Sequence, residues 1–128
     1  MKYLGIDYGE RKVGVAISDE GARYAFPHRV LKNDHVLIKE LTALIQREHI
    51  SEVVVGDSTD HQGGENPVMK GVRSFVEQLT RHTGVLVHYE PERYTTQEAR
   101  RGEPGAMLDA SAAALILQGF LDRKEGTQ

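Results

Sequence analysis

Carboxylate side chains stand at four separated places in the chain where a metal site could form. Asp7 ends an apolar segment, Asp57 follows a second one, and Glu92 follows a third. Asp109 continues the apolar stripe of the last helix-like segment at its N-terminal end. A carboxylate on a core-facing stripe is costly unless it is paired or bound to metal, and converging carboxylates repel one another. A divalent cation relieves both problems, and oxygen ligands in a chain without cysteine suit Mg²⁺ or Mn²⁺ rather than Zn²⁺.

The hydrophobic pattern predicts the elements that would position these side chains. Short apolar runs separated by polar, glycine-containing turns predict three antiparallel strands first, and helical spacing alternates with strands afterwards. Asp34 is a candidate N-cap for the first helix, and Asn66 and Pro67 are candidates for the N-cap and first position of the second. The predicted strands are residues 3–7, 13–18, 24–30, 53–55 and 85–89, and the predicted helices are residues 34–49, 67–83, 95–101 (short) and 109–124.

This order of elements predicts an α/β fold with a mixed five-stranded sheet flanked by helices. The fourth and fifth strands each follow a helix, so right-handed crossovers would make them parallel to the first strand, in the sheet order 3-2-1-4-5. The carboxyl ends of the three parallel strands then lie along one edge, where open α/β sheets bind ligands. We therefore expect one domain over residues 1–128, with the carboxylates meeting at that edge.

Each carboxylate also has a simpler interpretation. Asp7 could start a turn through an Asx hydrogen bond, and Asp57 could be a loop residue in a Gly-Asp-Ser-Thr turn. Glu92 could be a surface carboxylate paired with Arg93. Asp109 could be an N-cap or interact favourably with the helix dipole.

Composition limits the classes of protein to consider. Of the 128 residues, 39% are hydrophobic and 27% are charged, which is typical of a globular domain. The absence of cysteine excludes disulfides and thiol chemistry, and no apolar run or leader pattern indicates a membrane span or a signal peptide, so we expect a cytoplasmic protein. The net charge of −3 does not indicate nucleic-acid binding, although a local basic strip can exist on an acidic protein.

Four segments resemble the YqgF family, whose members are described as pre-16S rRNA nucleases or Holliday junction resolvase-like proteins. The resemblance covers nearly the whole chain in the right order and implies a ribonuclease H-like fold. The segments are residues 5–19 (GIDYGERKVGVAISD), 54–56 (VVG), 92–99 (ERYTTQEA) and 109–121 (DASAAALILQGFL).

With this resemblance, we expect a metal-dependent nuclease that hydrolyses phosphodiester bonds in structured RNA or branched DNA. Asp7 would be the central metal ligand, and Glu92 and Asp109 would complete the catalytic set. Asp57 is a candidate further ligand because of its position after the fourth strand, and the family pattern does not assign it. The groups expected to bind nucleic acid are Arg11, Lys12 and Arg93 through phosphates, and Thr95 and Thr96 through hydrogen bonds.

Departures from the family pattern keep alternatives open. Asp57 and Ser58 replace an apolar residue and proline, and Asp57 could compensate as an acidic residue at the end of the fourth strand. Pro91 replaces the family's aspartate, and the segment between Ala99 and Asp109 lacks a basic stretch, and these two departures weaken a direct transfer of activity. A non-catalytic nucleic-acid-binding or ribosome-associated module on the same fold is therefore the second hypothesis. A nucleotide-handling ATPase is the third, but the chain has one lobe and no P-loop pattern. Whether the protein is a monomer or a homodimer stays open.

Overall fold

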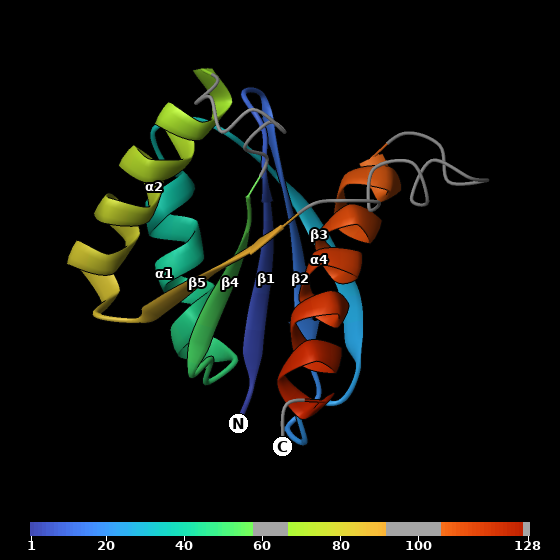
Figure 1. Cartoon of the computed structure of the whole chain (residues 1–128). Coiled ribbons are helices and arrows are strands. Elements are labelled where there is room, and N and C mark those ends of the chain that lie inside the picture. The colour runs from blue at the N-terminus through green and yellow to red at the C-terminus, as the bar shows by residue number, and fades with distance from the viewer. Residues whose placement is uncertain (58–66, 92–105, 127–128) are drawn as a thin grey trace.

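A computed structural model describes residues 1–57, 67–91 and 106–126 of the chain. Its strands are β1 (Tyr3–Tyr8), β2 (Lys12–Ser18), β3 (Ala25–Lys32), β4 (Glu52–Asp57) and β5 (Leu86–Pro91), and its helices are α1 (Leu37–Arg47), α2 (Pro67–Thr83) and α4 (Ala106–Gly126). Figure 1 shows three layers, in which α1 and α2 cover one face of the sheet and α4 covers the other.

The five strands form one mixed sheet in the order β3-β2-β1-β4-β5. β1 pairs with β4 and β4 pairs with β5 in parallel, while β2 pairs antiparallel with both β1 and β3. The predicted fold class and strand order are confirmed. The carboxyl ends of β1, β4 and β5 consequently lie along one edge, as the crossover argument requires.

Alternation along the central strands assigns each side chain to one face of the sheet. On β1, Leu4 and Ile6 are fully buried in the core formed with α1 and α2, whereas Tyr3 belongs to the smaller core beneath α4. On β4, Val53 and Val55 face α1 and α2, and Val54 faces α4. Strands buried on both faces need continuous apolar runs, which explains the Val53–Val55 segment.

Helix α4 runs antiparallel to β1 across the sheet. The ring of Phe120 lies 5.6 Å from the ring of Tyr3, near the start of β1. Two residues further along β1, Gly5 faces the backbone of Ala113 and the side chain of Leu117, which come earlier in α4. Since contacts move toward the start of the helix as β1 advances, the first turn of α4 lies toward the carboxyl end of β1.

The helix boundaries differ from the sequence prediction at two N-termini. α1 begins at Leu37 with Val36 in the N-cap position, so the prediction of Asp34 as N-cap is wrong. Asp34 instead closes the preceding turn: its Oδ1 accepts a hydrogen bond from the Val36 amide at 3.1 Å, and its backbone oxygen accepts one from Leu37, also at 3.1 Å. α4 begins at Ala106, three residues before the predicted start at Asp109.

Two further predictions concern the start of the second helix and a short helix at residues 95–101. α2 begins at Pro67 as predicted, with Asn66 outside the described residues. The predicted short helix at residues 95–101 lies outside them as well. Within the described part of the chain, none of the helices combines the length and apolar character needed to cross a membrane.

Candidate active site

Asp7 lies one residue before the end of β1, on the face that α4 covers. It pairs with Gly14 of β2 through the antiparallel register. Tyr3 and Gly5 of the same strand face α4, and side chains alternate along a strand, so Asp7 points to this face too. Asp7 is partly exposed at the carboxyl edge of the sheet.

Asp109 is the fourth residue of α4, one helical turn before Ala113. Ala113 faces Gly5, and Asp7 lies about 7 Å beyond Gly5 along the strand. One helical turn advances about 5.4 Å, so the antiparallel course brings the backbone of Asp109 to the level of Asp7. Because the helix begins at Ala106, the interpretation of Asp109 as N-cap is wrong.

Asp57 ends β4 and, by the pleat, belongs to the opposite face. Val53 and Val55 face α1 and α2, and Asp57 continues that alternation. The charge of Asp57 acts on Tyr89 of β5. Burial raises the pKa of the Tyr89 hydroxyl most, the charge of Arg73 in α2 lowers it, and the charge of Asp57 raises it. Asp7 and Asp57 therefore share an edge of the sheet but not a face.

Four of the predicted site residues, Glu92, Arg93, Thr95 and Thr96, lie outside the described residues. Glu92 follows directly on Pro91, which ends β5 and pairs with Asp57 of β4. Among the side chains that the structure describes, which exclude those of Glu92 and Asp109, no three acidic or histidine residues are grouped as a metal site. The full ligand set stays a prediction.

Glu90 lies within β5 and not after it, which corrects the predicted end of that strand at Tyr89. Its side chain is buried, with 8% exposed, and Arg123 of α4 donates a hydrogen bond to it. Its carboxylate also lies against Gly119 of α4. A buried carboxylate needs such a partner, so Glu90 joins β5 to α4.

Two lysines lie opposite each other in the sheet, and the sequence predicted only Lys12 as a nucleic-acid contact. Lys12 of β2 pairs directly with Lys32 of β3, and both side chains are exposed. Their neighbours Val13 and Leu31 face α1 and α2, so both lysines point to the face of Asp7. Like charges opposite each other destabilise a sheet unless an anion lies between them, so this pair suits a phosphate.

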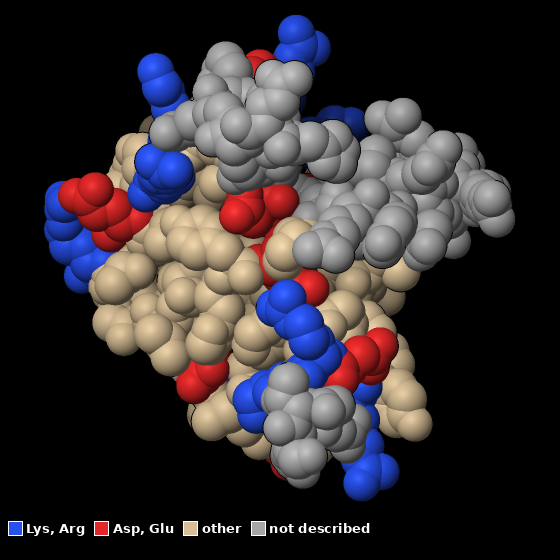
Figure 2. Space-filling view, viewed as in Figure 1, with Lys and Arg blue, Asp and Glu red and all other residues tan. Residues whose placement is uncertain are grey.

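Lys32 was missed because the third strand was predicted to end at residue 30. The strand continues to Lys32, and the cross-strand register is the signal that pairs it with Lys12. Arg11 lies in the turn before β2 with an exposed side chain, while its backbone oxygen accepts a hydrogen bond from the Asn33 amide at 2.9 Å. Figure 2 shows acidic and basic side chains interspersed on the viewed face.

Asp7 at this edge is of the donor type that a hard divalent cation prefers. Asp7 supplies carboxylate oxygens, the backbone of Asp109 reaches the same level, and the chain contains no cysteine. Lys12 and Lys32 supply positive charge on the same face. A site of carboxylates beside cationic side chains can bind a metal and a phosphodiester together.

The fold is ribonuclease H-like, and similar structures have been solved for resolvases. The structure matches Thermus thermophilus RuvC bound to a Holliday junction with a TM-score of 0.67 and 18% identity, covering 99% of this chain and 98% of that one. It matches the fowlpox virus resolvase bound to Holliday junction DNA with a TM-score of 0.62 and 10% identity, covering 97% and 99%. At these identities the similarity establishes the fold.

Sequence comparison gives the family. Residues 1–123 match the family model described as "RuvX: Holliday junction resolvase". A protein of Anaplasma marginale named "Putative pre-16S rRNA nuclease" is 38% identical over 98% of this chain and 87% of its own length. A Nitratidesulfovibrio vulgaris protein of the same name is 39% identical over 98% and 96%. The chain belongs to the RuvX (YqgF) family, a family of nucleases, which confirms the resemblance found in the sequence.

Proposed function

We propose that this protein is a metal-dependent endonuclease that hydrolyses phosphodiester bonds in structured nucleic acid, with precursor 16S rRNA as its first candidate substrate and branched DNA as its second. The relatives' names and the family model support the reaction class. The observation that carries the proposal is the position of Asp7 and the first turn of α4 on one face, at the carboxyl edge of the sheet.

Three carboxylates would hold Mg²⁺ or Mn²⁺: Asp7 as the central ligand, with Glu92 and Asp109. Asp57 is left out of this set because the pleat of β4 directs it to the opposite face. When bound, the cation supplies an activated water and stabilises the leaving oxygen. The carboxylates would hold the cation, and their shared negative charge would favour its binding.

Basic and hydroxyl side chains would orient the substrate beside these carboxylates. Lys12 and Lys32 lie on the same face as Asp7, so they can neutralise phosphates next to the cleaved bond. Arg11 and, beyond the described residues, Arg93, Thr95 and Thr96 complete the proposed contacts. Such an activity on ribosomal precursors would be cytoplasmic.

Removal of divalent cations is expected to abolish cleavage. Purified protein is incubated with precursor 16S rRNA and with four-way junction DNA, in EDTA and then with added Mn²⁺ or Mg²⁺. Products should form only with the cation, because the proposed carboxylates have no catalytic role without it. Cleavage that continues in EDTA would contradict the metal-dependent mechanism.

The same experiment distinguishes the nuclease from the second candidate function, a non-catalytic nucleic-acid-binding module. Pro91 favours that candidate, because it ends β5 where the family pattern has an aspartate. The module hypothesis predicts salt-sensitive binding without product at any cation concentration. Binding without cleavage of either substrate would therefore replace the nuclease proposal.

Substituting Lys32→Ala is expected to weaken substrate binding about tenfold and to reduce the salt dependence of log Kd by about one phosphate contact. Removing Lys32 leaves Lys12 as the remaining charge of the pair. Binding to a labelled RNA hairpin is measured in EDTA over a range of salt concentrations. Lys39→Ala, which removes an exposed lysine of α1, is the control, and an equal loss in both variants would contradict a specific contact.

A further inference from the structure

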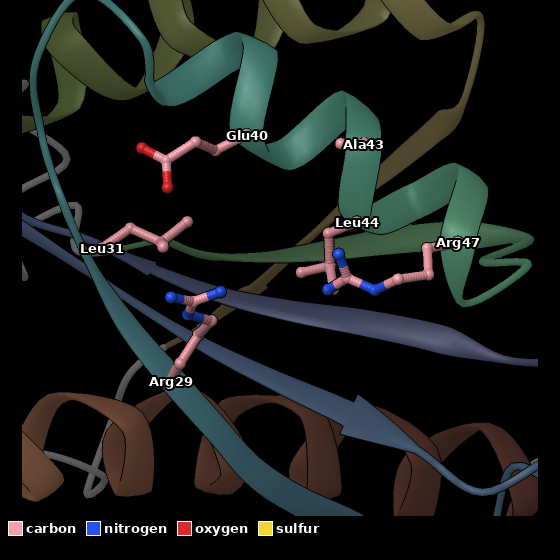
Figure 3. A pocket seen from close by; sticks show the side chains of 6 residues that line it. All are labelled: Arg29, Leu31, Glu40, Ala43, Leu44 and Arg47. Atoms are coloured by element: carbon pink, nitrogen blue, oxygen red, sulfur yellow. The ribbon is translucent and has the colours of Figure 1, made fainter.

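A second concave feature lies between β3 and α1, on the face of the sheet opposite Asp7. Figure 3 shows a shallow pocket with two arginine side chains turned into the same space, Arg29 from β3 and Arg47 from α1. Its volume is about 130 Å³, and its lining consists of Arg29, Leu31, Glu40, Ala43, Leu44 and Arg47. The proposed cleavage mechanism uses none of these residues.

The two guanidinium groups are poorly neutralised by the part of the chain that the structure describes. There, neither arginine forms an ion pair with Glu40, the one acidic residue of the pocket lining. Arg47 Nε lies 3.7 Å from Glu48 Oε2, but Lys2 Nζ lies 3.2 Å from Glu48 Oε1 and shares that charge. Both arginines are exposed, with 58% of the Arg47 side chain accessible, so water screens part of their mutual repulsion and an anion between them would relieve the rest.

The neighbouring histidine is sensitive to this positive potential. Burial lowers the pKa of His28 most, and the charges of Arg29 and Arg47 lower it further against the opposing effect of Glu48. His28 thus gives a spectroscopic measure of the charge in the pocket. An anion placed between the arginines would raise its pKa.

The chemistry of the pocket selects a phosphate group. A guanidinium is a planar fork of donors that matches two phosphate oxygens, and it pairs more favourably with phosphate than an ammonium does when partly desolvated. Leu31 and Leu44 provide an apolar floor that reduces competing water. The volume is well below that of ordinary small-molecule sites, so the pocket fits one group of a larger ligand.

The position of β3 connects this pocket to the candidate active site. β3 is an edge strand of the sheet, and it carries Lys32 on the Asp7 face and Arg29 on the α1 face. Basic side chains therefore continue from one face to the other around this edge. A nucleic acid that contacts Lys12 and Lys32 can reach the pocket by passing over β3.

We propose that the Arg29–Arg47 pocket binds a backbone phosphate of the nucleic-acid substrate, away from the bond that is cleaved. This inference rests on the proposed function, since it assigns a second contact to the same substrate. It makes Arg29 and Arg47 determinants of substrate affinity, with no part in the chemical step. It also predicts that substrates must extend past β3 to bind with full affinity.

The test compares the double variant Arg29→Ala/Arg47→Ala with the double variant Lys39→Ala/Arg81→Ala, which also removes two exposed positive charges. Thermal unfolding first confirms that both variants are folded. Binding of a labelled RNA duplex and of a four-way DNA junction is then measured in EDTA. The pocket variant should bind at least about tenfold more weakly and lose about two phosphate contacts from its salt dependence, while the control changes less than about twofold. Equal losses in the two variants, or no loss in either, would overturn the proposal.

A separate arm distinguishes a backbone phosphate from a free one. The pKa of His28 is followed by NMR in the wild-type protein with inorganic phosphate and with the RNA duplex. A backbone site predicts that the duplex raises this pKa at micromolar concentration and that inorganic phosphate does so only far above that. A shift at equal concentrations of inorganic phosphate, with unchanged duplex binding in the pocket variant, would assign the pocket to a free anion and overturn the proposal.

Cleavage assays separate this inference from the proposed function. With Mn²⁺ and saturating substrate, the pocket variant should cleave at the wild-type rate, because only affinity is lost. If the wild type binds through the arginines but never cleaves, the nuclease proposal fails and the phosphate site stands. If the pocket variant cleaves and binds as the wild type does, the phosphate site fails and the nuclease proposal stands.

Discussion

Substituting Asp7→Asn is expected to lower the rate of metal-dependent cleavage about a thousandfold while the fold stays intact. The exchange keeps the size of the side chain and the backbone pairing of residue 7 with Gly14. It removes the negative charge of the proposed central ligand, and metal ions contribute several kcal/mol of transition-state stabilisation, which corresponds to rate factors of this order. Initial rates at saturating Mn²⁺ measure the loss, and thermal unfolding of the same preparation measures the stability.

Asp57→Asn is the matched control for this prediction. It makes the same chemical change at the end of the neighbouring parallel strand, but on the face of α1 and α2. We expect cleavage within a few-fold of the wild-type rate. A loss comparable to that of Asp7→Asn would show that Asp57 reaches the metal despite the pleat, and full activity of Asp7→Asn would remove the central ligand from the proposal.

The topology could be predicted from the sequence because chain order and connection lengths leave few alternatives. Two short turns make the first three strands antiparallel, and each later strand follows a helix, which right-handed crossovers convert into parallel pairing. Boundaries were less predictable, since capping residues also close turns. Asp34 has the side chain of an N-cap but closes a turn two residues before the N-cap position at Val36.

The sequence predicted the edge of the sheet at which the site residues lie, but not the face to which each side chain points. Predicted strand ends at Val55 and Val30 left Asp57 and Lys32 outside the sheet, so the side to which they point was undefined. The structure extends both strands by two residues, and the pleat then separates Asp57 from Asp7 and brings Lys32 beside Lys12. A shift of one residue along a strand turns a side chain to the opposite face of the sheet. The alternation of apolar and polar residues no longer indicates the face where the end of a strand is polar.

Gly5→Ala is expected to lower the free energy of unfolding by about 3 kcal/mol, and to reduce cleavage as well. A Cβ atom at Gly5 would lie 2.7 Å from Leu117 Cβ and 2.9 Å from the backbone oxygen of Ala113. Neither neighbour can rotate away, because one is backbone and the other is the first carbon of a buried side chain. α4 must therefore move off β1, which also shifts Asp109 relative to Asp7. Urea unfolding measures the stability. The cleavage rate at urea concentrations well below the unfolding midpoint, where the variant is folded, measures the effect of moving α4.

Gly119→Ala is the control for that substitution, because it adds the same methyl group to α4 itself. There the nearest atom is Glu90 Oε2 at 3.3 Å, a terminal side-chain oxygen and not backbone, so a small shift of that carboxylate accommodates the new Cβ. Alanine also favours the helix over glycine by about 1 kcal/mol, so stability should be unchanged or higher. If Gly5→Ala were equally harmless, α4 would pack on β1 less tightly than the contacts indicate. The antiparallel alignment that brings Asp109 to the level of Asp7 would then lose its structural support.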